Sequence, residues 1–214
     1  MLKRNTDLVI KLLLFIFLVI LLVLVLYEAN RLEQSVEAKT IIMDDSVVMP
    51  HEELNLVRET SVLEKIKKCE KEYYYATNVW KYLRQRNFSQ AAACGIIGNM
   101  MIETSGGTLD LKPYVYSKSG NYYGLCQWSK KYYSGAFELP FEYQLDYLLG
   151  TISLEFKTFG WLYKDGYTLE DFLVIEDPEE AAFIFAKVYE RCGQASYEMR
   201  KKAASKAYEY FNIA

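Results

Sequence analysis

The sequence predicts an α+β domain that is mostly helical and contains one small β-hairpin, preceded by one N-terminal transmembrane helix. Three observations predict it. Apolar residues recur with helical spacing over most of residues 70–214. One segment, residues 109–124, instead carries Gly, Pro and alternating Tyr and Val. Residues 8–27 form an apolar run of membrane-spanning length. A chain of 214 residues is long enough for one domain with additional segments.

The apolar run LVIKLLLFIFLVILLVLVLY over residues 8–27 has Lys11 as its only charge. A helix of this length covers ~30 Å, the thickness of the bilayer hydrocarbon. Basic residues precede the run and acidic residues follow it, which predicts a cytoplasmic N-terminus over residues 1–7. No small-residue cleavage site follows, so we expect an uncleaved, single-pass anchor in the cell membrane; a cleaved signal peptide is the alternative. Residues 28–69 are then an extracellular stalk, and residues 70–214 an extracellular domain.

Composition excludes several classes of function. The chain has 25 Lys and Arg against 28 Asp and Glu, so bulk positive charge does not predict a nucleic-acid partner. His51, in the stalk, is the only histidine, which excludes an all-histidine zinc site and disfavours a peptidase or amidase. We therefore expect no metal and no cofactor. Nineteen tyrosines suit a ligand that presents apolar ring faces and hydroxyl groups.

Residues that typically begin or end helices occur at several points along the domain. Ser89 is a suitable N-cap, Gly106–Gly107 ends the helix that it begins, and Asp177–Pro178 opens another. The segment Leu109–Gly124 fits a small hairpin or loop. Within the stalk, Glu52–Lys68 has helical spacing but too little apolar surface for a core. The expected helices are Lys71–Arg86, Gln90–Thr104, Phe141–Phe156, Thr168–Leu173, Asp177–Tyr189 and Tyr197–Phe211.

Glu103 is the candidate catalytic acid. It lies in the last turn of the Gln90–Thr104 helix, where Ile96, Asn99 and Met100 share its face. Apolar neighbours and the negative end of the helix dipole are both expected to raise its pKa. A glutamic acid that is protonated near neutral pH can protonate the leaving oxygen of a glycosidic bond. The alternative is a solvated glutamate at a helix end.

Four motifs support this interpretation. Residues 92–104 (AACGIIGNMMIET) resemble the helix of the phage-tail lysozyme family, which carries Gly-Asn-Met and Glu-Ser at these places. Residues 123–128 (YGLCQW) resemble that family's Tyr-Gly-Leu-Phe-Gln-Trp, and are also similar to the Gly-Leu-Met-Gln of lytic transglycosylases. Residues 144–149 (QLDYLL) and 189–193 (YERCG) resemble its later Gln-Leu-Asp and Glu-Arg-Pro-Gly signatures. The motifs follow the family's order over residues 91–193.

The resemblance implies a lysozyme-like α+β fold that acts on peptidoglycan glycan strands, with Glu103 as the catalytic acid. Thr104 stands where the family has serine, which keeps the hydroxyl group.

Two cysteines also depart from the family pattern, Cys126 and Cys192. With Cys69 and Cys94 they allow three complete disulfide pairings, among which the sequence does not choose. A bridge between Cys126 and Cys192 would stiffen the substrate groove; buried free thiols are the alternative.

Four residues are candidate substrate ligands. The Gln127 amide can donate to a sugar N-acetyl carbonyl or to the catalytic carboxyl. Tyr123 and Trp128 offer ring faces that stack on a pyranose, although core packing is an alternative for Trp128. Tyr189 can line the same cleft, whereas we assign Glu190–Arg191 to structural ion pairs.

Asp110 is the candidate second carboxylate. Glycosidases place their partner carboxylates ~5–5.5 Å apart when retaining and ~6.5–9.5 Å apart when inverting. Asp110 follows Glu103 at the start of the expected hairpin, where a plain loop aspartate is the alternative. Without a second carboxylate, a single glutamate can serve as acid and then base in a lytic transglycosylase.

Together these features predict a membrane-anchored glycosidase. We expect a muramidase that cuts the MurNAc–GlcNAc β-1,4 bond, with peptidoglycan glycan strands as its partner and residues 8–27 in the membrane. It would open or remodel the cell wall locally, for example for a conjugation or secretion apparatus. The alternatives are a lytic transglycosylase and a catalytically silent, glycan-binding scaffold of a trans-envelope complex.

Overall fold

The structure, a computed structural model, describes residues 51–212. The expected cytoplasmic N-terminus, the membrane anchor at residues 8–27 and residues 28–50 of the expected stalk lie outside the described residues. Within residues 51–212, no helix combines the length and the apolar character needed to cross a membrane. From Glu52 onward the chain forms one compact unit.

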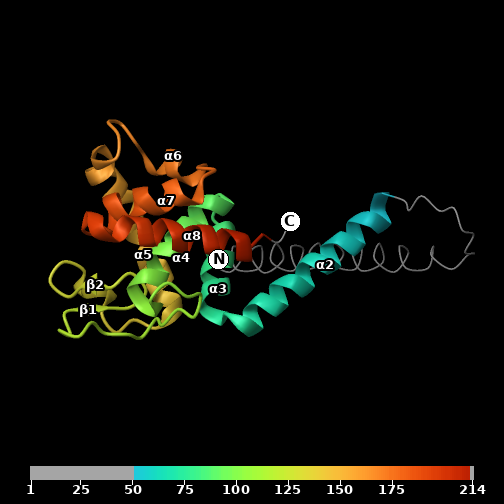
Figure 1. The fold of residues 1–214 in the computed structure, drawn as a ribbon, viewed down its shortest axis with the longest axis horizontal. Coiled ribbons are helices and arrows are strands. Elements are labelled where there is room, and N and C mark those ends of the chain that lie inside the picture. The colour runs from blue at the N-terminus through green and yellow to red at the C-terminus, as the bar shows by residue number, and fades with distance from the viewer. Residues whose placement is uncertain (1–50, 213–214) are drawn as a thin grey trace, which may run out of the picture. The chain divides into compact units, whose positions relative to one another are not determined.

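The architecture confirms a mostly helical α+β domain with a small antiparallel sheet (Figure 1). The α-helices are α2 (His51–Glu72), α3 (Tyr74–Arg84), α4 (Gln90–Ser105), α5 (Phe141–Phe159), α6 (Leu169–Leu173), α7 (Pro178–Phe185) and α8 (Tyr197–Tyr210). The strands are β1 (Tyr122–Tyr123) and β2 (Trp128–Ser129).

The predicted capping residues begin their helices. The Ser89 hydroxyl accepts a hydrogen bond from the Ala92 amide at 2.9 Å. Asp177 caps α7 in the same way, as predicted, and Thr168, for which no cap was predicted, caps α6. One helix differs from its prediction: the segment expected to run to Tyr189 leaves the α-helical pattern after Phe185 and continues as the π-helix η3 (Ala186–Glu190).

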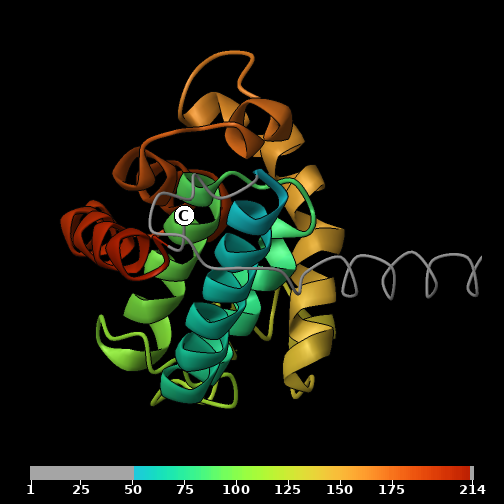
Figure 2. The ribbon, with the colours of Figure 1, turned by 90° about the vertical axis from the view of Figure 1, so that its right-hand side faces the viewer.

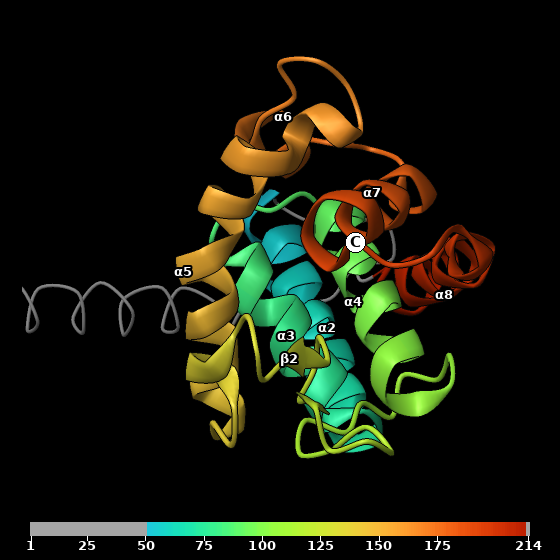
Figure 3. The same cartoon turned by 90° about the vertical axis from the view of Figure 1, so that its left-hand side faces the viewer.

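Helix α4 is the centre of the domain. It packs against α7, α8 and α3 (Figure 3), and residues 91–101 of α4 are all buried. A Cβ atom on Gly95 would lie 2.5 Å from the Ala181 Cβ atom of α7. A Cβ atom on Gly98 would lie 2.5 Å from the Ala204 nitrogen of α8. Glycine is therefore required at both positions, because the neighbouring backbones approach α4 within van der Waals contact.

The C-terminal part of the expected stalk packs on this core. Helix α2, drawn in blue to teal in Figure 2, includes residues that the sequence assigned to the stalk. Val62 and Ile66 lie against the core and Cys69 is buried within it. Their spacing of three to four residues places them on one helical face.

The hairpin forms later in the chain than predicted. The paired residues are Tyr122 with Ser129 and Tyr123 with Trp128, so the turn lies at residues 124–127. Gly124 and Gln127 take positive φ angles of 80° and 44°, which close this turn. The expected hairpin segment Leu109–Gly124 is otherwise irregular, apart from one bridge between Tyr116 and Tyr123.

Gln144 of α5 holds the loop-rich end of the domain together. Its buried amide donates to the carbonyls of Pro113 at 2.7 Å and Leu139 at 2.9 Å, and accepts from the Leu125 amide at 2.9 Å. Gly124 leaves room for this side chain, since a Cβ atom there would lie 2.6 Å from the Gln144 Oε1 atom. One side chain thus ties three separate loop segments to α5.

We predict that Gly98→Ala destabilises the protein by about 1–3 kcal/mol, because the added methyl group forces α4 away from α8. Thermal unfolding followed by circular dichroism measures the effect. The matched control is Gly150→Ala on α5, where a Cβ atom meets nothing within 4 Å. Alanine there is expected to stabilise the helix by about 0.5–1 kcal/mol. Equal melting temperatures for the two variants would contradict the close packing.

We predict that Gln144→Leu leaves buried loop groups without partners and costs about 1–3 kcal/mol for each such group. The loop-rich segment should loosen before the helices unfold. Amide hydrogen exchange measures this as faster exchange of the Leu125 amide, with unchanged protection in α4. Uniform exchange across both regions would show that Gln144 does not have this local role.

Candidate active site

Glu103 lies in the last turn of α4, as predicted, and its side chain is 20% exposed. The Glu103 Oε1 atom accepts a hydrogen bond from the guanidinium of Arg200 on α8. The Arg200 side chain is only 4% exposed, so this is a largely buried ion pair. The apolar neighbours Ile96 and Met100 are buried as expected, but the surroundings of Glu103 also include a cation that the sequence did not indicate. A cation from a distant part of the chain lies against its carboxyl group.

Asn99 fixes the position of Arg200. Its Oδ1 atom accepts from the Arg200 Nη1 atom at 2.8 Å. Its Nδ2 atom donates to the carbonyls of Gly95 at 2.9 Å and Ala182 at 3.0 Å. Asn99 thus joins α4 to both α7 and α8. The Gly-Asn-Met motif has a physical role here: Gly98 permits the close approach, and the asparagine aligns the guanidinium.

A second carboxyl group, Glu190, belongs to the same cluster. It ends the π-helix η3, just before Arg191, which takes a left-handed conformation with φ 49°. The Glu190 Oε1 atom is buried and has no hydrogen-bond partner within residues 60–212. Burial, and then the negative charge of Glu103, raise the pKa of Glu190 to about 8, although Arg200 and a hydrogen bond to the Cys126 thiol lower it. Glu190 is therefore predominantly neutral at pH 7.

The prediction for Glu190 and Arg191 is half correct. Arg191 pairs with Glu155 of α5 and with the Tyr133 hydroxyl, so it makes the structural ion pair that we expected. Glu190 makes no ion pair in the described part of the chain and faces the Glu103–Arg200 pair instead.

The cysteines are free thiols, so no bridge joins Cys126 to Cys192. The Cys192 sulfur accepts a hydrogen bond from the Ser196 hydroxyl at 3.3 Å. Cys126 is buried, and burial and the charges of Glu190 and Glu103 raise its pKa well above the usual value. Its thiol stays protonated and can donate to Glu190.

The candidate aromatic ligands Trp128 and Tyr189 are both 2% exposed. The Trp128 Nε1 atom donates to the Tyr189 hydroxyl at 3.0 Å. That hydroxyl lies 2.8 Å from the Thr151 hydroxyl of α5. The Tyr189 ring stacks on Phe185 at 4.7 Å between centroids. These contacts fasten the hairpin to the helices, and they leave neither ring face open to a sugar in this structure.

Tyr123 and Gln127 are also engaged within the domain. Tyr123 is buried, with its ring against Tyr116. The Gln127 amide donates to the carbonyls of Val115 and Gly124, each at 3.1 Å. Nothing within residues 60–212 joins Gln127 to the Glu103 carboxyl by a hydrogen bond. Substrate binding by these side chains stays a prediction.

Asp110 is exposed, between the buried residues Leu109 and Leu111. No hydrogen bond or ion pair within the described residues links it to Glu103. The structure therefore brings Glu190, rather than Asp110, into the electrostatic range of Glu103. The role of Asp110 in the reaction stays a prediction.

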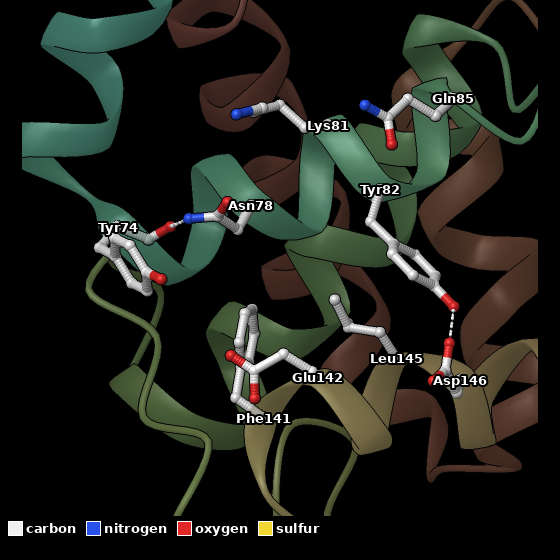
Figure 4. A pocket seen from close by; sticks show the side chains of 9 residues that line it. All are labelled: Tyr74, Asn78, Lys81, Tyr82, Gln85, Phe141, Glu142, Leu145 and Asp146. Carbon is white, nitrogen blue, oxygen red and sulfur yellow. Dashed lines mark hydrogen bonds between the residues drawn. The ribbon is translucent and has the colours of Figure 1, made fainter.

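A pocket of about 420 Å³ lies between α3 and α5 (Figure 4). Across it, the Tyr82 hydroxyl donates to Asp146, the aspartate of the Gln-Leu-Asp motif. None of the predicted site residues lines this pocket. Its lining residues are Tyr74, Asn78, Lys81, Tyr82, Gln85, Phe141, Glu142, Leu145 and Asp146.

Arg200 and Glu190 are the site residues that sequence reasoning missed. Arg200 shares one helical face with Ala203, Ala204 and Ala207, all of which are buried. A single arginine on a face of alanines was a signal that it is buried and paired. Glu190 had a signal in its position within the Tyr-Glu-Arg motif, but the burial of its carboxyl required the tertiary structure.

The pKa of Glu190 predicts a pH-dependent stability. Its value is about 8 in the folded protein, against an ordinary value of 4.5, so the folded state binds this proton more tightly. The resulting stabilisation is complete below pH ~4.5 and is lost as the pH rises to about 8. Glu190→Gln stays neutral throughout. We therefore expect its melting temperature, relative to the natural protein, to increase from pH 5 to pH 8.

Calorimetry at several pH values measures this difference. The matched control is Glu209→Gln at an exposed position of α8, which should follow the natural protein at every pH. A constant difference between Glu190→Gln and the natural protein over this range would contradict the assignment of a neutral Glu190.

A comparison with protein-family models identifies the family of the domain. Residues 75–211 match the family model described as phage tail lysozyme. This description indicates a lysozyme-like, peptidoglycan-cleaving domain. No curated protein matches the chain significantly. The matched region contains Glu103, Asn99, Glu190 and Arg200, and it covers more than half of the sequence. The chain therefore belongs to the phage tail lysozyme family.

Proposed function

We propose that the domain cleaves the MurNAc–GlcNAc β-1,4 bond of peptidoglycan glycan strands, with Glu103 as the general acid. The observation that carries this proposal is the Glu103 carboxyl, which is partly exposed at the end of α4 and oriented by a buried arginine. A general acid must reach the leaving oxygen and be held in one orientation. The Glu103 side chain is partly exposed and is held in one orientation, as this role requires.

Thr104, the residue after Glu103, helps to fix the end of α4. The Thr104 hydroxyl donates to the Met100 carbonyl at 2.8 Å and lies 3.3 Å from the Lys112 amide. The end of α4 is thus tied to the segment that follows it. Threonine provides here the hydroxyl that the family pattern provides with serine.

Hydrolysis and transglycosylation differ in what attacks the anomeric carbon. In hydrolysis a water molecule attacks, and the product has a reducing end. In a lytic transglycosylase the 6-hydroxyl group of the sugar attacks, and the product has a 1,6-anhydro end. We propose hydrolysis as the reaction, with transglycosylation as the alternative product pattern.

We also propose that residues 8–27 anchor the protein in the cell membrane with the domain outside the cell, where it would open or remodel the wall locally, for example for a conjugation or secretion apparatus. The apolar run and the charges that flank it support this proposal. Protease treatment of intact protoplasts should degrade the domain and spare the N-terminus. Full protection of the domain would reject the orientation.

We predict that Glu103→Gln lowers the rate of peptidoglycan cleavage by about 10²–10⁴-fold, because the amide has no proton to transfer. Glutamine keeps an oxygen that accepts from Arg200, so the fold should be retained. Mass spectrometry of the muropeptides released from purified walls measures both the rate and the type of product end.

Glu209→Gln is the matched control and should cleave at the natural rate. A Glu103→Gln variant that cleaves normally would reject Glu103 as the acid. No cleavage by the natural protein, together with retained glycan binding, would favour the silent scaffold.

A further inference from the structure

A pocket of about 480 Å³ lies between the C-terminal half of α5, the loop that follows it and the start of α6. Its volume is within the range of ligand-binding pockets, ~300–1,000 Å³. Both a buried ring, Phe156, and an exposed ring, Trp161, line this Trp161 pocket. It shares no lining residue with the contacts of Glu103 described above.

The Trp161 pocket lies at the opposite end of α4 from Glu103. Helix α6 is fastened to the start of α4, where the Ser89 amide donates to the Leu173 carbonyl at 2.7 Å. Phe156 packs on Phe172 of α6 at 5.0 Å between ring centroids. Along α4, the distance from Ser89 to Glu103 is ~20 Å at the rise of an α-helix. Figure 3 shows α6 and the hairpin at opposite ends of the domain. The pocket is therefore separate from the candidate active site.

Trp161 is exposed to solvent and yet fixed in place. It belongs to the short helix η2 (Gly160–Leu162) and is 64% exposed. Its Nε1 atom donates to the Thr158 carbonyl at 3.1 Å, which orients the indole ring. No aromatic ring or cation within residues 60–212 stacks on this ring. Trp161 therefore offers a large apolar face that a ligand can cover.

The loop that carries Trp161 is held in one shape. Its two ends touch, since a Cβ atom on Gly160 would lie 2.1 Å from the Tyr167 carbonyl oxygen. The Tyr163 amide donates to the Gly160 carbonyl at 3.0 Å, and the Tyr167 amide to the Lys164 carbonyl at 3.1 Å. The Tyr163 hydroxyl donates to Glu180 of α7. The pocket is therefore preformed, and a ligand needs to order little of the chain.

Four polar side chains of the pocket are available to a ligand. Ser153 and Lys157 lie on α5, Asp165 lies in the loop and Glu170 lies on α6, and all four are exposed. None of these side chains forms a hydrogen bond or an ion pair within residues 60–212. Together they can both donate to and accept from the hydroxyl and amide groups of a ligand.

We propose that the Trp161 pocket is a second glycan-binding site, which holds a peptidoglycan strand at a distance from Glu103. The inference rests on the proposed function, because its ligand is the strand that the domain would cleave. A pyranose ring has an apolar face and a rim of polar groups, which matches one open indole face beside unpaired polar side chains. The carboxylates of Asp165 and Glu170 disfavour an anionic lipid surface.

A strand that is bound at two places stays near Glu103 for longer. Once one contact has formed, the second forms at a high effective concentration. The Trp161 pocket would therefore strengthen the attachment of the protein to long strands.

Co-sedimentation with purified, insoluble peptidoglycan tests the inference. The full-length protein, kept soluble in a neutral detergent, carries Glu103→Gln so that binding is measured without cleavage. In this background Trp161→Ala should weaken binding about 10-fold, because the second contact is lost. Trp161→Phe keeps a ring face and should keep most of the binding. The matched control is Leu154→Ala on α5, at a residue that is 65% exposed and does not line the pocket.

Two results would overturn the inference directly. One is equal binding with and without Trp161→Ala. The other is an equal loss in Leu154→Ala, which would indicate unspecific apolar adhesion. The peptidoglycan is assayed before and after removal of attached anionic polymers. If Trp161 contributes to binding only before this removal, the anionic polymer is the ligand and the glycan strand is rejected.

If Trp161→Ala does not fold, acrylamide quenching of tryptophan fluorescence in the Glu103→Gln protein decides instead. Trp80 stacks on Phe211 and Trp128 is buried, so Trp161 dominates the quenching. Soluble β-1,4-linked N-acetylglucosamine oligomers should reduce it, and unchanged quenching would reject the inference. Absence of cleavage by the natural protein would reject the proposed function, whereas binding that depends on Trp161 would still support the pocket.

Discussion

The close approach of α4 to α7 and α8 is the constraint on which the rest of the structure depends. Gly95 and Gly98 allow the backbones of three helices to approach within a distance that no larger residue permits. The alanines of α8 provide the complementary surface. Because the helices are this close, side chains from residues 99, 103 and 200 can meet although they are distant in the chain. The contacts of Asn99 and Glu103 with Arg200 are a consequence of small-residue packing.

The motifs shared with the phage tail lysozyme family are explained largely by structure. Gly98 and Asn99 align α4 with its neighbours, and Gln144 ties three loop segments to α5. Trp128 and Tyr189 hold the hairpin to the helices through a shared hydrogen bond. The Glu103 carboxyl, by contrast, is partly exposed. The family motifs in this domain therefore serve mainly to position the end of α4 that carries Glu103.

The charged groups around Glu103 are balanced within the fold. A buried arginine needs compensating negative charge, and each carboxyl near it needs either the cation or a proton. Arg200 compensates the charge of the Glu103 carboxyl, and burial raises the pKa of Glu190 so that this carboxyl needs no cation of its own. The partial exposure of Glu103, against the buried Oε1 atom of Glu190, decides which carboxyl can meet a substrate.

Local patterns in the sequence determined the helices of the domain, their caps and the position of Glu103 at the end of α4. Hydrogen bonds within a few residues and the periodicity of apolar side chains determine these features. Both depend on residues that are close together in the sequence. The hairpin was misplaced, because its turn depends on the left-handed Gly124 and Gln127 and on Gln144 from α5. Only the tertiary structure could place Arg200 beside Glu103 and turn Glu190 toward both. Electrostatic partners are chosen by distance in space, and no spacing along the chain encodes which buried charges will meet.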